Sequence, residues 1–459
     1  ECSECAETVK HLFQQEGHSW PLNFQRFTLY MNENYKTLLD TRGQNPTAPW
    51  ICTEELWIGR PIGHYVPFHC DDSCAFALRE FLHQFATCST AFTSLVIDLL
   101  LDAAGVEELI ETLKSELPKV LDLSVVPDGA QKLVQKVAVL EELPNLQILK
   151  LRIRASSYGG DKVKVVEFAK DLIQKAPTKL TEVDLQVDEY GFKGDGAAPT
   201  AMANMIGALP SLKRFRVGMN SDVIFISEAK PALASFVAAV TANTSHTKLE
   251  SFSFMCPSIS GDLRNEYERF GKALASMPEL REINMTWCRW EDSDKDAFLP
   301  HFITKKPATL RKLLLKGARL RDHDLQTVSK IIEKQPLEVI DISTNRGVSD
   351  QGLHHISEAL GNLQKLTPAV PCHLREVYAL ELRKVTDRGI QELFQSLQNC
   401  PNLTLLDVST PSLRQRSYLS TYATIEMAMK ARRFSWPNIT RLVVTYVNRE
   451  YNLVEVDPL

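Results

Sequence analysis

The residues best suited to chemistry lie near the start of the chain. Cys2 and Cys5 form a Cys-x-x-Cys pair, and a second group follows much later at His69, Cys70 and Cys74. Thiolate and imidazole groups of this kind can hold zinc in a tetrahedral site. The two groups are far apart in sequence, however, and adjacent residues such as His69 and Cys70 are awkward as joint ligands. We therefore predict no metal site and no cofactor.

The cysteines are unevenly distributed. Ten occur in 459 residues, and six of these fall in the first 90: Cys2, Cys5, Cys52, Cys70, Cys74 and Cys88. An even number of cysteines in a short segment permits disulfides, which form in oxidising compartments. Unpaired thiols in a reducing compartment are the alternative that we favour.

Motifs of known catalytic type are missing from the sequence. It contains neither a glycine-rich phosphate loop nor a His-Glu-x-x-His pair. His354 and His355 fall within an expected helix, where surface histidines are the simpler interpretation. We predict that the protein is not an enzyme.

Composition argues against two classes of partner. The formal net charge of −5 gives no general attraction to nucleic acid or to anionic membranes. The longest apolar run, "FTSLVIDLLLDAAGV", is interrupted by Asp98 and Asp102 and is too short to cross a bilayer. We predict no nucleic-acid partner and no membrane span.

A helix-opening motif recurs late in the chain. "VSDQGLHHISEAL" and "VTDRGIQELFQSL" share valine, serine or threonine, aspartate and glycine at the same places, and "LRDHDLQTVSKII" repeats their apolar spacing. Ser349 and Thr386 are expected to cap these helices, with the side-chain oxygen accepting from a backbone N–H. The spacing i, i+3, i+4, i+7 predicts one apolar helix face, formed in the second copy by Ile390, Leu393, Phe394 and Leu397.

A strand pattern, apolar-x-x-apolar-x-apolar, recurs between such helical stretches. Its first positions are Phe92, Val120, Leu146, Leu180, Leu212, Leu249, Leu280, Leu310, Leu337, Leu374, Leu403 and Ile439. A single helix–strand unit cannot bury its apolar face, whereas stacked units form a continuous core. The periodicity therefore predicts a repeat protein.

The units resemble the leucine-rich-repeat superfamily, in particular the helix-bearing class seen in ribonuclease inhibitor and in F-box leucine-rich-repeat proteins. "VTDRGIQELFQSLQNCPNLTLLDVST" is the clearest copy, although the Asn or Cys often found just beyond the strand is mostly absent. The resemblance implies an α/β fold, a solenoid with a curved parallel sheet and outer helices. We expect about twelve irregular repeats over residues 91–445, a Cys- and Trp-rich cap without the repeat over 1–90, and a C-terminal cap or tail over 446–459. The Leu-Pro opening of an F-box is not found in 1–90, so the ubiquitin-ligase adaptor role is not carried over.

In such a fold, residues between the apolar strand positions face the concave side. Here they form stripes of alternating charge, which suit a folded protein partner better than a polyanion. Trp287 and Trp290 follow one strand and are of the type that anchors interfaces, although either could instead pack on its own helix. The predicted partner-binding residues are Lys150, Arg152, Glu182, Asp184, Arg214, Arg216, Glu282, Asn284, Lys312, Trp287 and Trp290.

The sequence thus predicts a non-catalytic scaffold or adaptor that binds a protein partner through the concave face and loops of the repeats. We expect it in the cytoplasm. The alternative is a secreted or surface-displayed recognition protein with a disulfide-linked N-terminal cap. Free-thiol content distinguishes the two.

Overall fold

The computed structural model describes most of the repeat region and part of the rest. The described residues are 22–30, 51–59, 94–113, 119–125, 129–133, 146–153, 169–170, 173, 179–187, 197–219, 229–244, 248–255, 263–288, 290–366, 372–409, 438, 441–447 and 453–454. The chain forms two compact units. The first comprises Glu1–Phe192 and Ala208–Leu212, and the second Lys193–Gly207 and Lys213–Leu459.

The first unit contains a parallel sheet whose strands follow chain order. They are β1 (Leu22–Tyr30), β2 (Ile51–Gly59), β3 (Ser94–Leu101), β4 (Val120–Val125), β5 (Ile148–Ile153) and β6 (Glu182–Val187). Helix α4 (Ala103–Leu113) follows β3. Leu95, Leu121, Leu149 and Val183 lie side by side across β3–β6 and are fully buried, because each repeat contributes one side chain to the same apolar row.

Two strands of this sheet lie within residues 1–90. β1 pairs in parallel with β2, and β2 with β3, so the predicted cap segment extends the sheet. The boundary at residue 90 stays a prediction. Cys2, Cys5, His69, Cys70, Cys74 and Cys88 lie outside the described residues, as do the side-chain surroundings of Cys52.

The second unit repeats the arrangement with a helix between most neighbouring strands. Its strands are β7 (Arg214–Met219), β8 (Ser251–Met255), β9 (Glu282–Asn284), β10 (Lys312–Leu314), β11 (Val339–Asp341), β12 (Glu376–Tyr378), β13 (Leu405–Ser409) and β14 (Arg441–Val447), all parallel. A short β15 (Leu453–Val454), within the expected C-terminal tail, pairs antiparallel with β14.

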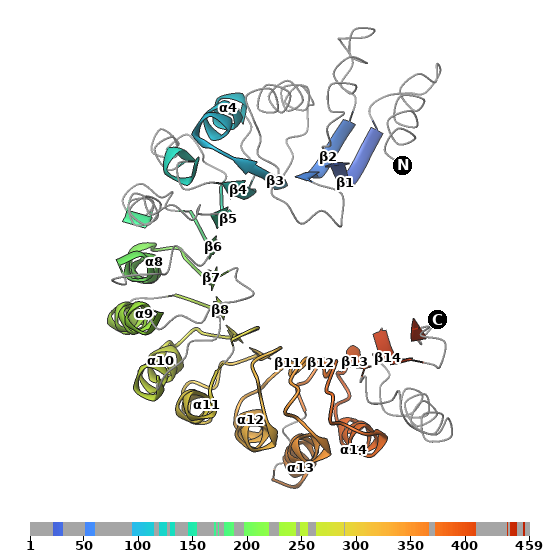
Figure 1. Ribbon diagram of the computed structural model, residues 1–459. Helices are drawn as coiled ribbons and strands as arrows, with labels where there is room; N and C mark the ends of the chain where they lie inside the picture. Colours follow the sequence, from blue (N-terminus) through green and yellow to red (C-terminus); the bar gives the residue numbers. More distant parts are fainter. Residues whose placement is uncertain are drawn as a thin grey trace. The chain divides into compact units, whose positions relative to one another are not determined.

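The helices of this unit form a row of their own. They are α8 (Ala197–Ala208), α9 (Ala229–Asn243), α10 (Arg264–Ser276), α11 (Asp292–Phe298), the 3₁₀ helix η4 (Leu299–Phe302), α12 (Asp322–Lys334), α13 (Asp350–Leu366) and α14 (Asp387–Leu397). From α9 to α14 they lie along the outer side of the bend, with the strands on its inner, concave side (Figure 1). The expected α/β leucine-rich-repeat fold is therefore confirmed.

The strand pattern located the sheet closely. Eleven of its twelve starting positions precede the observed strand by two residues, since the first apolar residue ends the preceding loop. The unit at Val120 is the exception. There Leu121 is in register with Leu95 and Leu149. The sequence pattern had instead placed Leu123 in register with these two residues. Because Leu121, Leu123 and Val125 are all buried, alternation alone does not fix the register.

The core lies between the sheet and the helices. Phe236 on α9 stacks on Phe254 of β8 at 5.0 Å between ring centroids, and Phe270 on α10 meets Phe252 edge-on at 5.5 Å. The predicted apolar face of α14 is confirmed, because Ile390, Leu393, Phe394 and Leu397 are all buried.

Candidate protein-binding surface

The chain leaves β9, β10, β11 and β12 through the same backbone turn. Four residues beyond the aligned apolar row, each repeat has a residue with positive φ: Trp287 (63°), Gly317 (65°), Thr344 (59°) and Glu381 (54°). The repeat of β10 has a second such residue, Arg319 (55°). The backbone N–H groups at the shared position continue the sheet pairing, as Trp287 N donates to Lys316 O at 2.7 Å and Thr344 N to Leu380 O at 2.7 Å. Side chains at this position therefore project from the strand edge on a fixed backbone.

Two repeats use the position directly after this turn to tie the loop. Asn345 Nδ2 donates to Leu315 O at 2.9 Å and Ile342 O at 2.7 Å, while its Oδ1 accepts from Leu320 N at 2.9 Å. Cys288 Sγ donates to Phe254 O at 3.1 Å. They occupy the place of the Asn or Cys that most other repeats lack, and here they satisfy buried backbone groups.

The recurring Ser/Thr-Asp-x-Gly motif links one repeat to the next. Asp350 accepts from Thr386 N at 2.6 Å and from Thr386 Oγ1 at 2.5 Å. Asp322 accepts in the same way from Ser349 N at 2.7 Å and Ser349 Oγ at 2.6 Å. A Cβ on Gly389 would lie 2.5 Å from Asp350 Oδ1, so glycine is required for the carboxylate to approach.

Of the two predicted N-cap side chains, Ser349 and Thr386, only one makes the expected hydrogen bond. Ser349 Oγ accepts from Gln351 N at 3.3 Å, as a capping side chain should. Thr386 makes no side-chain cap bond, so its predicted role is wrong. Its hydroxyl donates to the carboxylate of the preceding repeat instead.

A buried lysine holds the loop before α12. Lys295 Nζ has no exposed surface and lies 2.9 Å from Asp292 Oδ1, 2.8 Å from Asp324 Oδ2 and 2.7 Å from Arg319 O. Burial raises the pKa of Asp292, but the Lys295 hydrogen bond and the charges of Lys295 and Arg321 outweigh it and hold that pKa below its usual range. The carbonyl contact fixes the backbone that carries Arg319.

In the part of the chain that the structure describes, Asp292, His323 and Asp324 bring ligand atoms within 4.8 Å of one another. The cluster does not fit a metal ion, because the Lys295 ammonium already supplies its positive charge. Asp324 also accepts from Arg321 N at 2.7 Å, which caps α12. The cluster is structural.

The predicted binding residues of the first unit lie in neighbouring rows. Lys150 faces Asp184 in register, and its Nζ is 3.7 Å from Glu182 Oε1. Arg152 pairs with Asp122 at 3.1 Å. Asp184 is 8% exposed. The expected stripes of opposite charge therefore neutralise one another in part across strands.

The second unit brings five predicted residues onto two rows of the concave face. Arg214 is in register with Ser251 and, through it, with Glu282 and Lys312; Arg216 aligns in the same way with Asn284. The Lys312 Nζ to Glu282 Oε2 distance is 4.0 Å, a loose pair between partly exposed side chains. Whether these residues bind a partner stays a prediction.

The two tryptophans have different environments. Trp287 is 40% exposed; Gly317 lies beneath its ring, and Lys316 Nζ is 5.9 Å from the ring centroid. Trp290 is 2% exposed and packs against Tyr267 and Phe298. The expectation that Trp290 anchors a partner is wrong, because its indole fills the core beneath α10 and α11.

A tyrosine missed by sequence reasoning completes an acidic row. Tyr378 is in register with Asp341 and Asp407 on the concave face. Its hydroxyl donates to Glu376 Oε2 at 2.9 Å. Burial, the Glu376 hydrogen bond and the nearby carboxylates raise the pKa of Tyr378 to about 12. Tyr378 occupies the same position in its repeat as Asn284 does in its own. Comparing equivalent repeat positions in the sequence would therefore have identified Tyr378 as a concave-face residue.

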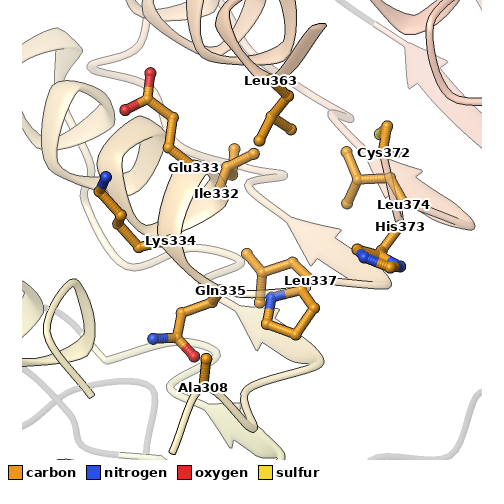
Figure 2. A pocket seen from close by; sticks show the side chains of 11 residues that line it. Ala308, Ile332, Glu333, Lys334, Gln335, Leu337, Leu363, Cys372, His373 and Leu374 are labelled. Atoms are coloured by element: carbon orange, nitrogen blue, oxygen red, sulfur yellow. The ribbon is translucent and has the colours of Figure 1, made fainter. Parts of the chain in front are cut away.

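A pocket of about 250 Å³ lies on the opposite edge of the sheet, where α12 ends and β11 and β12 begin. Its lining is largely apolar, including Ile332, Leu337 and Leu363, with His373 at one side (Figure 2). Its neighbours at 367–371 lie outside the described residues. Catalytic groups do not converge on it among the described residues, and His354 is exposed beside Glu392, as expected of a surface histidine.

None of the described helices is long and apolar enough to cross a membrane. No protein-family model matches the sequence, and no curated protein matches it. Among solved structures, the chain is similar to one in the crystal structure of the Rad7 and Elc1 complex in yeast. The identity is 15%, the TM-score is 0.49, and the match covers 82% of each chain. At this level the likeness carries no conclusion about function.

Proposed function

We propose that the protein is a non-catalytic scaffold or adaptor of the helix-bearing leucine-rich-repeat class, related in type to ribonuclease inhibitor and F-box leucine-rich-repeat proteins. The observation that carries the proposal is Trp287. A bulky residue rarely adopts positive φ, and an exposed one contributes little to the core. The repeat turn holds this conformation, so the indole is kept exposed at the end of the strand.

The surroundings of Trp287 support a protein as the partner. The strands of this unit carry basic, neutral and acidic groups on their concave side. Arg214 and Arg216 lie on β7, Ser251 and Ser253 on β8, Asp341 on β11 and Asp407 on β13. Such mixed charge favours a folded surface of complementary pattern, since electrostatics steers encounter and rejects wrong partners. An exposed tryptophan among polar groups is typical of an interface anchor.

The proposal is tested by quantitative affinity capture with the full chain from an extract of its source. Trp287→Ala and the pair Arg214→Glu/Arg216→Glu are each expected to reduce recovery of specific partners at least tenfold. Arg269→Glu/Lys272→Glu on α10 is the matched control, because both residues are exposed on the helix side. If the control loses the same proteins, or if both surface variants keep them all, the assignment of this face is wrong.

The alternative, a secreted or surface-displayed recognition protein, gains support from a disulfide between Cys372 and Cys400. Disulfides persist mainly in oxidising compartments. The bridge lies in the repeats, whereas this alternative places its disulfides in the N-terminal segment. The compartment itself stays a prediction, with the cytoplasm as the first expectation.

A further inference from the structure

A row of arginines follows the left-handed turn in consecutive repeats. Two residues beyond each turn stand Arg319, Arg346 and Arg383, and all three are exposed. Arg289 occupies the same repeat position in the sequence but lies outside the described residues. We call Arg319, Arg346 and Arg383 the loop-arginine row.

The backbone beneath this row is rigid. Gly317 N donates to Ser343 O at 2.8 Å and Thr344 N to Leu380 O at 2.7 Å, so adjacent turns remain paired. The loops stay aligned beyond the row, where Arg321 bridges Gly347 and Ser349 bridges Lys384 in parallel. Neighbouring parallel strands are about 4.8 Å apart. The backbones that carry successive arginines are therefore separated by about this distance.

The positive charge of the row is largely uncompensated. Arg319 Nη1 lies 3.5 Å from Glu291 Oε1, but both side chains are about half exposed, so the pair is weak. Among the described residues, neither Arg346 nor Arg383 has an acidic side chain within 4.0 Å. Lys316 and Lys384 add further positive charge beside the row.

Trp287 lies at one end of the row. Its ring lies over Gly317, in the same loop as Arg319, and a Cβ on Gly317 would come within 2.3 Å of Trp287 Cε3. Lys295 holds Arg319 O at 2.7 Å, which fixes that loop from the inside. An exposed apolar ring thus lies at one end of a row of three exposed arginines.

We propose that the loop-arginine row and Trp287 bind an acidic segment of the partner protein, whose carboxylates pair with the arginines and whose apolar side chain packs on the indole. The inference rests on the proposed scaffold function and names the chemistry of the segment that is bound. Arginine favours carboxylates because its planar fork can form two parallel hydrogen bonds with them.

Nucleic acid fits this edge less well. Among the described residues, no large hydrophobic side chain other than Trp287 is exposed. The edge therefore lacks a series of aromatic rings on which successive bases could stack.

The test measures binding of the full chain to an array of fifteen-residue peptides. Their net charge runs from strongly negative to strongly positive, and each is made with and without a central Leu or Phe. The wild type is expected to retain acidic peptides with the apolar residue. Arg319→Glu/Arg346→Glu/Arg383→Glu should reduce this signal at least tenfold. Trp287→Ala should remove the preference for the apolar residue while the preference for negative charge remains.

The matched control is Arg269→Glu/Lys272→Glu/Lys330→Glu, which changes net charge equally on exposed helix positions. Thermal unfolding of every variant establishes that the fold is intact. A wild type without preference for acidic peptides, or a control that loses the signal equally, would overturn the proposal. So would tighter binding of single-stranded oligothymidylate than of any acidic peptide.

The same variants separate this inference from the scaffold function. If affinity capture is abolished by Arg214→Glu/Arg216→Glu but not by the loop-arginine triple variant, the scaffold stands and the acidic-segment proposal fails. If neither variant changes capture, both fail.

Discussion

Lys295 shows how one side chain can hold a loop in place. Its ammonium is fully buried, with two carboxylates and one carbonyl within 2.9 Å. Removing one member of a buried ion pair leaves the remaining charge without compensation, which commonly costs about 3–5 kcal/mol. Asp324, which is 1% exposed, would carry that cost.

We expect Lys295→Met to lower the free energy of unfolding by about 3–5 kcal/mol in urea titrations. Lys295→Met/Asp324→Asn should lose less than the sum of the two single variants, because the second change removes the uncompensated charge. Strict additivity would show that the pair is not coupled.

Lys305 makes stability depend on pH at the basic end. Its Nζ donates to Met277 O at 2.6 Å beyond the end of α10, and burial lowers its pKa to about 8. Between this value and the unfolded value of 10.5, the unfolded chain holds a proton that the folded chain has lost. The free energy of unfolding contributed by Lys305 therefore rises as pH increases through this window.

The prediction concerns the difference in the free energy of unfolding between the wild type and a variant without the lysine. Urea unfolding of the wild type and of Lys305→Met is compared at about pH 7 and about pH 10, where the other titrating groups affect both proteins alike. The advantage of the wild type should grow toward the higher pH. A constant or shrinking difference would contradict the lowered pKa.

At the scale of an element, the helix N-termini are linked from repeat to repeat. Asp350 at the start of α13 accepts two hydrogen bonds from Thr386 at the start of α14, and Asp322 of α12 does the same for Ser349. The carboxylates also lie at the positive ends of helix dipoles. Packing of helix on helix is thereby accompanied by a polar link with fixed geometry.

We expect Gly389→Ala to destabilise the protein by about 1–3 kcal/mol, because a new Cβ would meet Asp350 Oδ1 at 2.5 Å. In an Asp350→Ala background the same change should cost clearly less, since the carboxylate is gone and alanine favours the helix. Chemical denaturation of the four proteins in this cycle gives the coupling. Equal costs in both backgrounds would show that the carboxylate does not require the glycine.

At the scale of the whole molecule, the Cys372–Cys400 bridge joins the segments that lead into β12 and β13. It closes a loop with a sequence separation of 28 residues, which corresponds to about 3.5 kcal/mol of stabilisation in the chain-entropy view. Cys288, by contrast, is buried without being part of a disulfide, and its thiol donates to Phe254 O.

Thiol titration of the denatured, unreduced protein should find at most eight of the ten cysteines reactive, and Cys372→Ala/Cys400→Ala should unfold at lower urea concentration. Ten reactive thiols would contradict the bridge and favour the cytoplasmic expectation. The same titration reports on the cysteines of the first 90 residues.

The strands and the apolar helix faces were predictable from sequence, because burial imposes periods of two and 3.6 on residues such as Leu406, Val408 and Ile390. Stacking of repeats followed from the same pattern, since one unit leaves its face uncovered. The register at Leu121 was not predictable, because three alternating residues of that strand are equally buried.

The surface required the tertiary structure. Trp287 and Trp290 are three residues apart, and only the positive φ at Trp287 sends one ring to solvent while the other enters the core. The pairing of Asp350 with Thr386 and the loop-arginine row join residues of different repeats, whose distance depends on strand register. Sequence by itself determined a repeat fold of alternating strands and helices, because periodic burial is a local property. The tertiary structure decided which side chains lie together on the exposed surface, because that depends on how neighbouring repeats align.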